Sequence, residues 1–195
     1  MLLTLLLAAC GPHIVDVRAL DDFPAALVDP LELSIGVYFP PEFSTFSHQE
    51  KRPAPSAQEW TINLGNPQVQ AFRSVFSSTF RELHELSGPH GGPAGMQAII
   101  VPRVSEFQFA LPADTRAKIF EIWVKYDLEI LDASGESIAH WNFTAYGKTP
   151  TAALTSDEDA IRAATVIALR DAGASLVIGL RRDSRIRSWL GMPQG

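Results

Sequence analysis

Apolar and polar residues alternate most regularly between residues 120 and 131. Phe120 and every second residue after it up to Ile130 are apolar, and the positions between them are mainly charged. A period of two residues predicts a strand that buries one face. The polar stretch DASGES follows with Gly135, which predicts a turn, and residues 138–147 return as an antiparallel strand. The pattern therefore predicts a long β-hairpin.

Two further segments are predicted to be strands. Residues 31–39 alternate between apolar and polar side chains and end at Pro40-Pro41, where proline interrupts the backbone hydrogen bonds of a strand. Residues 96–104 form a short apolar run that is typical of a buried strand, and residues 105–111 continue it past a bend at Pro102. Residues 59–65 are predicted either to extend the sheet formed by these strands or to pair with it.

Two helices are predicted from apolar residues that recur three or four positions apart. The first begins at Asn66, a favourable N-cap, with Pro67 as its first helical residue. It is predicted to end at Gly88-Pro89. The apolar residues on one face of this helix are Val69, Phe72, Phe76, Phe80, Leu83 and Leu86.

The second helix is predicted to begin after Ser156, which is a suitable N-cap. Residues 157–159 are acidic and fall in the first turn, where the helix dipole favours negative charge. The sequence is then rich in alanine and apolar on most sides up to Ile178, so we expect a buried helix. Small residues that allow close approach to the sheet or the first helix are Ala164, Ala168, Ala172 and Gly173.

The order strand, helix, strand, hairpin, helix determines the predicted fold. A strand–helix–strand unit crosses over right-handedly and leaves its two strands parallel, whereas the hairpin adds antiparallel neighbours. We therefore predict an α+β two-layer sandwich, in which a mixed sheet of four to five strands carries both helices on one face.

The first eleven residues contain the most specific motif of the chain. Residues 1–9 are apolar apart from Thr4 and are too short to cross a membrane. The ending Leu7-Ala8-Ala9-Cys10 resembles the lipobox of bacterial lipoproteins. This resemblance implies that the Cys10 thiol is acylated with diacylglycerol, that the leader is cut just before Cys10, and that the new N-terminus is then acylated. Gly11 resembles the residue found in outer-membrane lipoproteins. The alternative is a frayed apolar terminus with an incidental cysteine.

The lipobox divides the chain into four predicted parts. Residues 1–9 are the lipoprotein signal, and because they contain no Lys or Arg we expect the signal to begin upstream. Residues 10–30 are predicted to be the lipid anchor and tether, 31–180 a single periplasmic domain, and 181–195 a basic tail. Within the domain, the prolines of residues 40–58 predict a long loop.

Charge and composition narrow the class of partner. The net charge of −6 argues against a nucleic-acid partner, and 46% hydrophobic residues indicate a globular chain. Cys10 is the only cysteine, so no disulfide can form within the chain in an oxidising periplasm.

The sequence carries none of the motifs that would indicate catalysis at a serine, a phosphate-binding loop or a metal site. No G-x-S-x-G elbow occurs, and Gly147-Lys148-Thr149 lacks the upstream glycine of a phosphate-binding loop. His84 and His90 lie near two glutamates without the spacing of a metal site. We therefore expect no enzyme, no metal and no cofactor.

The element order behind a lipobox resembles small envelope lipoproteins with folds like LptE, the CsgG core or the TolB N-terminal domain. This resemblance implies an outer-membrane, periplasm-facing accessory protein that acts in envelope assembly or transport by docking to an envelope protein. The alternative is a carrier that binds a lipid or another apolar ligand between sheet and helices. Candidate contact residues in the loop, hairpin and tail are Phe43, Phe46, Trp123, Trp141, Arg182, Arg185 and Trp189. The two tryptophans of the hairpin either pair across it or belong to a contact surface.

Overall fold

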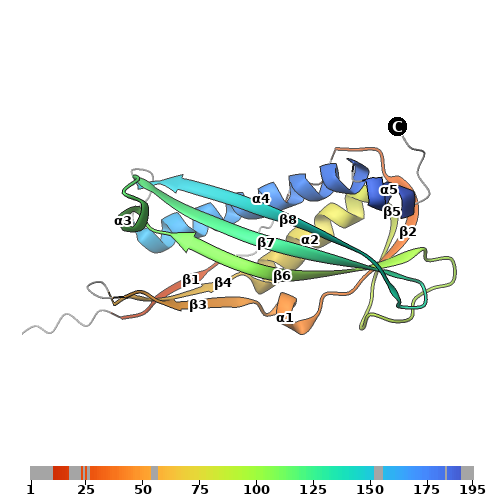
Figure 1. Ribbon diagram of the computed structural model, residues 1–195, viewed down its shortest axis with the longest axis horizontal. Helices are drawn as coiled ribbons and strands as arrows, with labels where there is room; N and C mark the ends of the chain where they lie inside the picture. Colours follow the sequence, from red (N-terminus) through yellow and green to blue (C-terminus); the bar gives the residue numbers. More distant parts are fainter. Residues whose placement is uncertain are drawn as a thin grey trace, which may run out of the picture.

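The fold is α+β and contains two sheets, as the computed structural model in Figure 1 shows. The five-stranded sheet has the order β5-β2-β6-β7-β8, and the three-stranded sheet has the order β1-β4-β3. The described residues are 11–17, 23, 25, 27–53, 57–151, 156–182 and 184–189. The predicted signal and Cys10 lie outside them.

The five-stranded sheet is mixed, as predicted. Strands β5 (Phe80–Glu85), β2 (Leu31–Val37) and β6 (Ala98–Ala110) are parallel, whereas β7 (Ile119–Asp132) and β8 (Ser137–Pro150) are antiparallel to their neighbours. The parallel pairing of β2 with β6 confirms that these two predicted strands run parallel.

The long β-hairpin is confirmed by β7 and β8. The apolar residues of β7 at even positions, from Phe120 to Ile130, are all nearly or fully buried. Gly135 has a φ of +91° in the connecting turn, a conformation that glycine adopts without the steric cost of a side chain. The alternating pattern therefore determined both the strand and the face that it buries.

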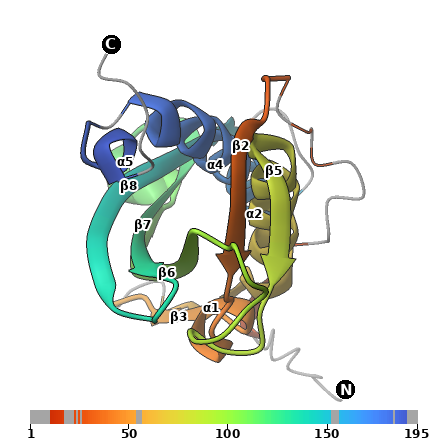
Figure 2. The same cartoon turned by 90° about the vertical axis from the view of Figure 1, so that its right-hand side faces the viewer.

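Helix α4 (Asp157–Arg182) packs on β7 and β8, and helix α2 (Gly65–Thr79) packs on β5 and on α4, as Figures 1 and 2 show. The hydroxyl of Ser156 accepts a hydrogen bond from the Asp159 N–H at 3.1 Å, which confirms the predicted cap. Helix α4 is also long and apolar enough to cross a membrane, a test that core helices of soluble proteins pass as well.

Helix α4 approaches β8 most closely at Gly147. A Cβ atom on Gly147 would lie 2.0 Å from the Ala164 carbonyl oxygen and 2.5 Å from the Ala168 nitrogen. Gly147 is thus explained by helix–sheet packing, and the small residues predicted on this helix form the other half of the contact.

The first predicted helix is wrong at both ends. Helix α2 begins at Gly65 with Leu64 as N-cap, so Asn66 is not the cap, and it ends at Thr79. Phe80 starts strand β5, which pairs with β2. The spacing of Phe80 and Leu83 suits a helix face, but pairing along β2 satisfies the backbone of this segment instead.

The prediction of a single sheet is also wrong, because three short strands form a second one. Strand β4 (Glu59–Asn63) pairs in parallel with β1 (His13–Asp16) and antiparallel with β3 (Ser47–Lys51). Part of the segment 10–30, for which we predicted a tether, therefore contributes a strand. The predicted loop over 40–58 contains helix α1 (Pro41–Ser44) as well as β3.

Aromatic contacts attach the second sheet to the end of β6. Trp60 of β4 is 1% exposed and stacks on His13 at 4.2 Å, and its ring lies 5.6 Å from that of Phe109. The Arg52 guanidinium lies 4.2 Å above Phe109 and forms an ion pair at 3.3 Å with Asp114 of helix α3 (Pro112–Thr115). The second sheet thereby closes one end of the core.

Candidate functional site

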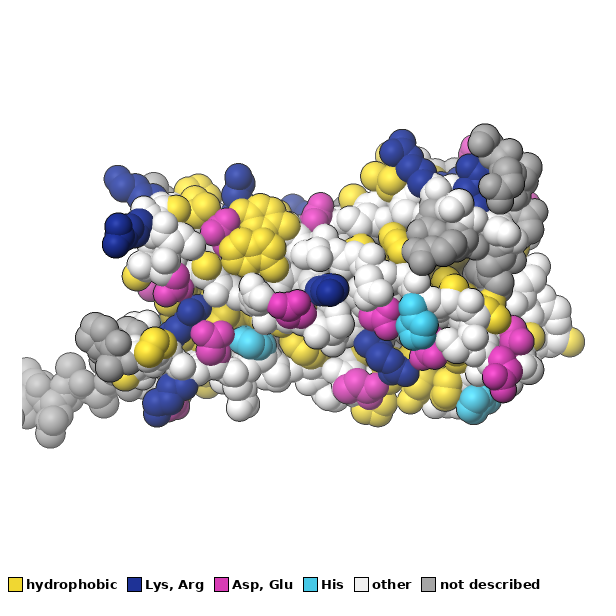
Figure 3. Space-filling model, viewed as in Figure 1, with side chains coloured by type: hydrophobic (Ala, Val, Ile, Leu, Met, Phe, Trp, Pro, Cys, Tyr) yellow, Lys and Arg dark blue, Asp and Glu magenta, His cyan; other side chains and the backbone are white. Residues whose placement is uncertain are grey.

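The face of strands β6, β7 and β8 that is turned away from α4 is the candidate functional site, and we call it the outer face. Figure 3 shows this face toward the viewer, with a compact hydrophobic patch over β7 and β8. Side chains on the outer strand β8 at even positions, such as Asn142, Thr144 and Lys148, are exposed. Helix packing therefore covers one face of these strands and leaves the other to solvent.

The aromatic patch consists of Trp123 on β7 and Tyr146 on β8. These residues are directly opposite in the strand register, and their ring centroids are 5.4 Å apart with an interplanar angle of 36°. Both side chains are half-buried, and the residues around the neighbouring depression, apart from Trp123 itself, are polar or charged. Paired aromatic rings on a solvent-facing sheet indicate a contact surface more than a core position.

Two hydrogen bonds fix Tyr146 in the aromatic patch. The phenol donates to Glu121 Oε1, and the backbone N–H donates to Asp171 Oδ2 of α4 at 2.9 Å. The bond to the Glu121 carboxylate is the main cause that raises the pKa of Tyr146 to about 12, with burial a smaller cause. The phenol therefore stays protonated at neutral pH and holds one orientation.

A small depression of about 190 Å³ lies beside the aromatic patch. Its lining combines the Trp123 ring with charged and polar groups that donate and accept hydrogen bonds. The other lining residues are Glu106, Gln108, Lys125 and Thr144. The site therefore presents an apolar centre with a polar rim, which is the usual anatomy of a protein interface.

The predicted loop residues belong to the packed interior. Phe43 is fully buried and contacts Phe72 at 5.2 Å, so it leaves no surface for a partner, which corrects its assignment as a contact residue. Phe46 is half-buried and packs on Phe107 at 5.8 Å. Phe43 is therefore part of the core, and Phe46 packs against it.

The two tryptophans of the hairpin do not pair with each other. Trp141 lies opposite Leu128 on the helix face, stacks on Phe143 at 4.9 Å, and occupies the space beside Gly179 of α4. Trp123 lies on the outer face, so only Trp123 of this pair lies on the contact surface. Its partner Tyr146 was not among the predicted site residues.

The predicted residues of the basic tail are only partly described. Arg182 is exposed at the end of α4. Arg185 and Trp189 belong to helix α5 (Ser184–Trp189), but their side chains lie outside the described part of the chain, as does the lipidation candidate Cys10. These three residues stay predictions.

Ionisable residues of the described part of the chain do not converge on a catalytic arrangement. Within that part, no group of three or more His, Cys, Asp or Glu side chains is placed to hold a metal ion. On the outer face, Asp127 pairs with His140 at 3.1 Å and Arg103 pairs with Glu129 at 3.3 Å. These contacts are exposed cross-strand ion pairs, which contribute little to stability.

No protein-family model and no curated protein matches this chain. Among solved structures, protein XCC0632 of Xanthomonas campestris, of family DUF330, matches with a TM-score of 0.53 and 15% sequence identity, over 88% of this chain and 98% of that protein. A proposed lipoprotein from Caulobacter crescentus CB15 matches with a TM-score of 0.41 and 15% identity, over 65% of this chain and 83% of the other. The Xanthomonas match shows a shared fold. The predicted resemblance to LptE, CsgG and TolB stays a prediction.

Proposed function

We propose that this chain is a lipid-anchored accessory protein of the bacterial envelope that binds another envelope protein and performs no catalysis. In this proposal Cys10 carries the acyl anchor in the outer membrane and the domain faces the periplasm. The docking role rests on one observation, the aromatic patch of Trp123 and Tyr146 on the outer face of the sheet.

Several properties of the aromatic patch suit protein docking. Tryptophan and tyrosine contribute more binding energy to protein interfaces than most residues do. Both side chains project from paired strands, and the Glu121 hydrogen bond holds the Tyr146 ring, so little side-chain freedom remains to be lost on binding. The charged rim, which includes Lys125, would set the orientation of the partner.

Photocrosslinking in cells tests the docking surface. The full chain would carry benzoylphenylalanine in place of Lys125, beside the aromatic patch, or in place of Ile167, which is exposed on α4. We expect position 125, but not 167, to capture an envelope protein. Capture should fall about thirtyfold or more when Trp123→Ala is added, because a hot-spot residue contributes at least about 2 kcal/mol.

The control for this experiment is Asn142→Ala, which removes an exposed side chain from β8 without touching the aromatic patch. This variant should retain capture. A folded Trp123→Ala chain that captures the same protein with the yield of Asn142→Ala would contradict docking through the aromatic patch.

Metabolic labelling tests the anchor separately from docking. Cells that express the full chain and are fed labelled palmitate should incorporate label into it, because the lipobox chemistry requires the thiol of Cys10. The Cys10→Ser variant should lose the label. Equal labelling of both chains would refute the lipid anchor and leave the docking surface to be judged by crosslinking.

A second candidate function is to carry an apolar ligand, and one observation supports it. A pocket of about 340 Å³ lies against helices α2 and α4. We predicted that such a ligand would lie between the sheet and the helices. That space is filled by core side chains, such as the fully buried Ile122, Leu128 and Leu176. The pocket lies elsewhere, on the side of the helices that carries the segment before β2.

A further inference from the structure

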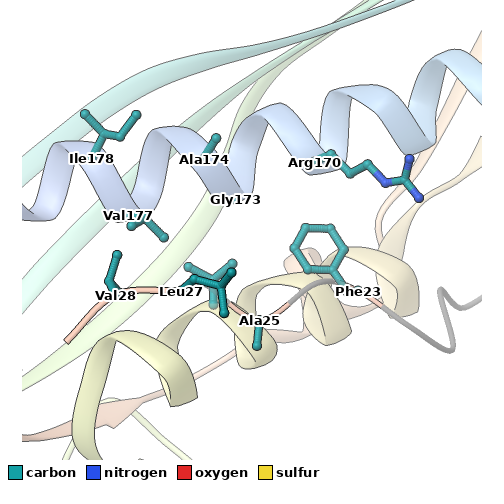
Figure 4. Close-up of a pocket in the computed structure, with 10 residues that line it drawn as sticks. Phe23, Ala25, Leu27, Val28, Arg170, Gly173, Ala174, Val177 and Ile178 are labelled. Carbon is teal, nitrogen blue, oxygen red and sulfur yellow. The ribbon is translucent and has the colours of Figure 1, made fainter. Parts of the chain in front are cut away.

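The pocket on the helices is a groove beneath a short chain segment. Phe23, Ala25 and residues 27–29 belong to this segment, which we call the strap. Figure 4 shows Phe23 opposite Arg170 and Gly173, and Val28 opposite Val177 of α4; Ile178 also lines the pocket. Val75 of α2 completes the lining. The volume of about 340 Å³ falls within the range of small-molecule sites.

Two hydrogen bonds hold the described residues of the strap. The Phe23 carbonyl accepts a hydrogen bond from Ser74 Oγ at 3.2 Å, and the Asp29 carbonyl accepts one from Arg181 Nη2. Between these points Leu27 is fully exposed, and Ile178 across the groove is 51% exposed. Two large apolar side chains are therefore left to solvent along a groove that is almost entirely apolar.

Small residues make the groove possible. Gly173 and Ala174 stand where larger side chains would fill it. A Cβ atom on Gly173 would lie 3.0 Å from the Phe23 ring and 3.2 Å from Val75 Cγ2, so Gly173 is already in close contact with the floor of the groove. Ala174 is exposed, and its methyl group borders open space.

The two ends of the groove carry arginines in different states. Arg181 donates to the Asp29 carbonyl and lines a second depression together with Asp29, so its guanidinium is already engaged by the strap. Arg170 is exposed and lines the groove, and within the described part of the chain no ion pair or hydrogen bond involves it. The open cationic end of the groove is therefore at Arg170.

We propose that this groove binds a single acyl chain with an anionic head group, namely a long-chain fatty acid, with its carboxylate at Arg170. The proposal rests on the carrier function given above as the second candidate. From Arg170 to Ile178 the helix rises about 12 Å, which gives an apolar track for the part of an extended acyl chain nearest its carboxylate. The chain would cover Leu27 and Ile178, and the guanidinium would pair with the carboxylate.

Photolabelling of the full chain in its own membrane tests the proposal. The probes are a photoreactive, alkyne-tagged myristic acid and the corresponding fatty alcohol, and adducts are mapped by peptide mass spectrometry. We expect light-dependent acid adducts in the strap and in residues 170–181. Label attached to the N-terminal cysteine does not depend on light and is thereby separated.

Two pairs of variants locate the chain and its head group. Ala174→Leu fills the groove and should abolish these adducts, whereas Ala163→Leu, on the same helix but outside the groove, should retain them. Arg170→Glu should lower labelling by the acid about tenfold and leave the alcohol unchanged, because a charged hydrogen bond contributes about 1.5–3 kcal/mol. Lys148→Glu has the same charge change at a distant exposed site and should have no effect.

The possible outcomes separate the proposal from the carrier function. If acid and alcohol label the groove equally and Arg170→Glu changes neither, the anionic ligand is refuted and a carrier for neutral apolar ligands remains. If Ala174→Leu, with an unchanged melting temperature, labels as the unaltered chain does, both the proposal and the carrier function are refuted. Labelling by a photoreactive phospholipid in preference to the acid would also overturn the fatty-acid assignment.

Discussion

Replacing Gly147 by alanine should strongly destabilise the protein, because it inserts a methyl group between β8 and α4. The added carbon would lie 2.0 Å from the Ala164 carbonyl oxygen and 2.5 Å from the Ala168 nitrogen. Both are backbone atoms in the middle of a helix of 26 residues, so no side-chain rotation relieves the contact. The helix must move outward instead.

The expected loss in the free energy of unfolding follows from this displacement of α4. Ordinary contact between carbon and its neighbours is about 3.5–4.0 Å, so α4 must shift by about 1.5 Å relative to β8. The shift loosens the packing of Ile161, Ala164 and Leu169, which are 0–1% exposed. Overpacking of this kind typically costs about 1–3 kcal/mol, and we expect the upper end because the obstacle is backbone.

Urea unfolding measures the effect. With a slope of about 2 kcal/mol per molar urea, a loss of about 3 kcal/mol lowers the midpoint by about 1.5 M. Gly88→Ala is the matched control, since its added Cβ would meet nothing within 4 Å, and it should leave the midpoint almost unchanged. A Gly147→Ala midpoint equal to that of Gly88→Ala would refute the close helix–sheet contact.

Two other predictions concern polar contacts. Gln68 is fully buried, donates a hydrogen bond to the Phe43 carbonyl at 2.6 Å and accepts one from the Tyr126 hydroxyl at 3.3 Å. Gln68→Leu should therefore lower the free energy of unfolding by about 2 kcal/mol in the same urea assay. A midpoint within error of the unaltered protein would contradict this prediction. The hydrogen bond from His13 is the main cause that holds the pKa of Glu158 below its usual 4.5. Because a lowered carboxyl pKa stabilises the fold above the unfolded value, this contribution should disappear as the pH falls through 4.5 and below. The pH dependence should be shallower in His13→Ala, and identical slopes in the two proteins would argue against the contact.

The sequence predicts elements well where one face of an element is apolar and the other polar. The β7–β8 hairpin and the cap of α4 follow from residues within a few positions of each other, so local chemistry is sufficient. Strand β5 was missed because Phe80 and Leu83 continue the helical spacing, and only pairing with β2 ends the helix. Strand β3 was missed because its inward residues include His48, which packs on Phe107, so no apolar alternation marks it.

The candidate surfaces also differ in how far the side-chain pattern of the sequence indicates them. Trp123 could be identified because it interrupts a polar face, but the register of the hairpin pairs it with Tyr146, five residues beyond Trp141. The turn at Gly135 alone would pair Trp123 with Ala145, and the irregularity between Ile130 and Leu131 shifts the register by one residue. The strap could not be found in this way, since it is held through the carbonyls of Phe23 and Asp29, and backbone contacts leave no side-chain pattern.

Strand β8 lies at the edge of its sheet, and an edge strand is the usual place for a partner to add a strand of its own. At Tyr146 that route is closed. Its N–H points away from β7 and is already bonded to Asp171 Oδ2 of α4 at 2.9 Å, so an added strand would have to break this bond and separate α4 from the edge. Because the same residue presents its ring on the outer face, a partner at this position gains the aromatic contact without disturbing the helix. The geometry therefore favours docking on the face of the sheet over docking on its edge.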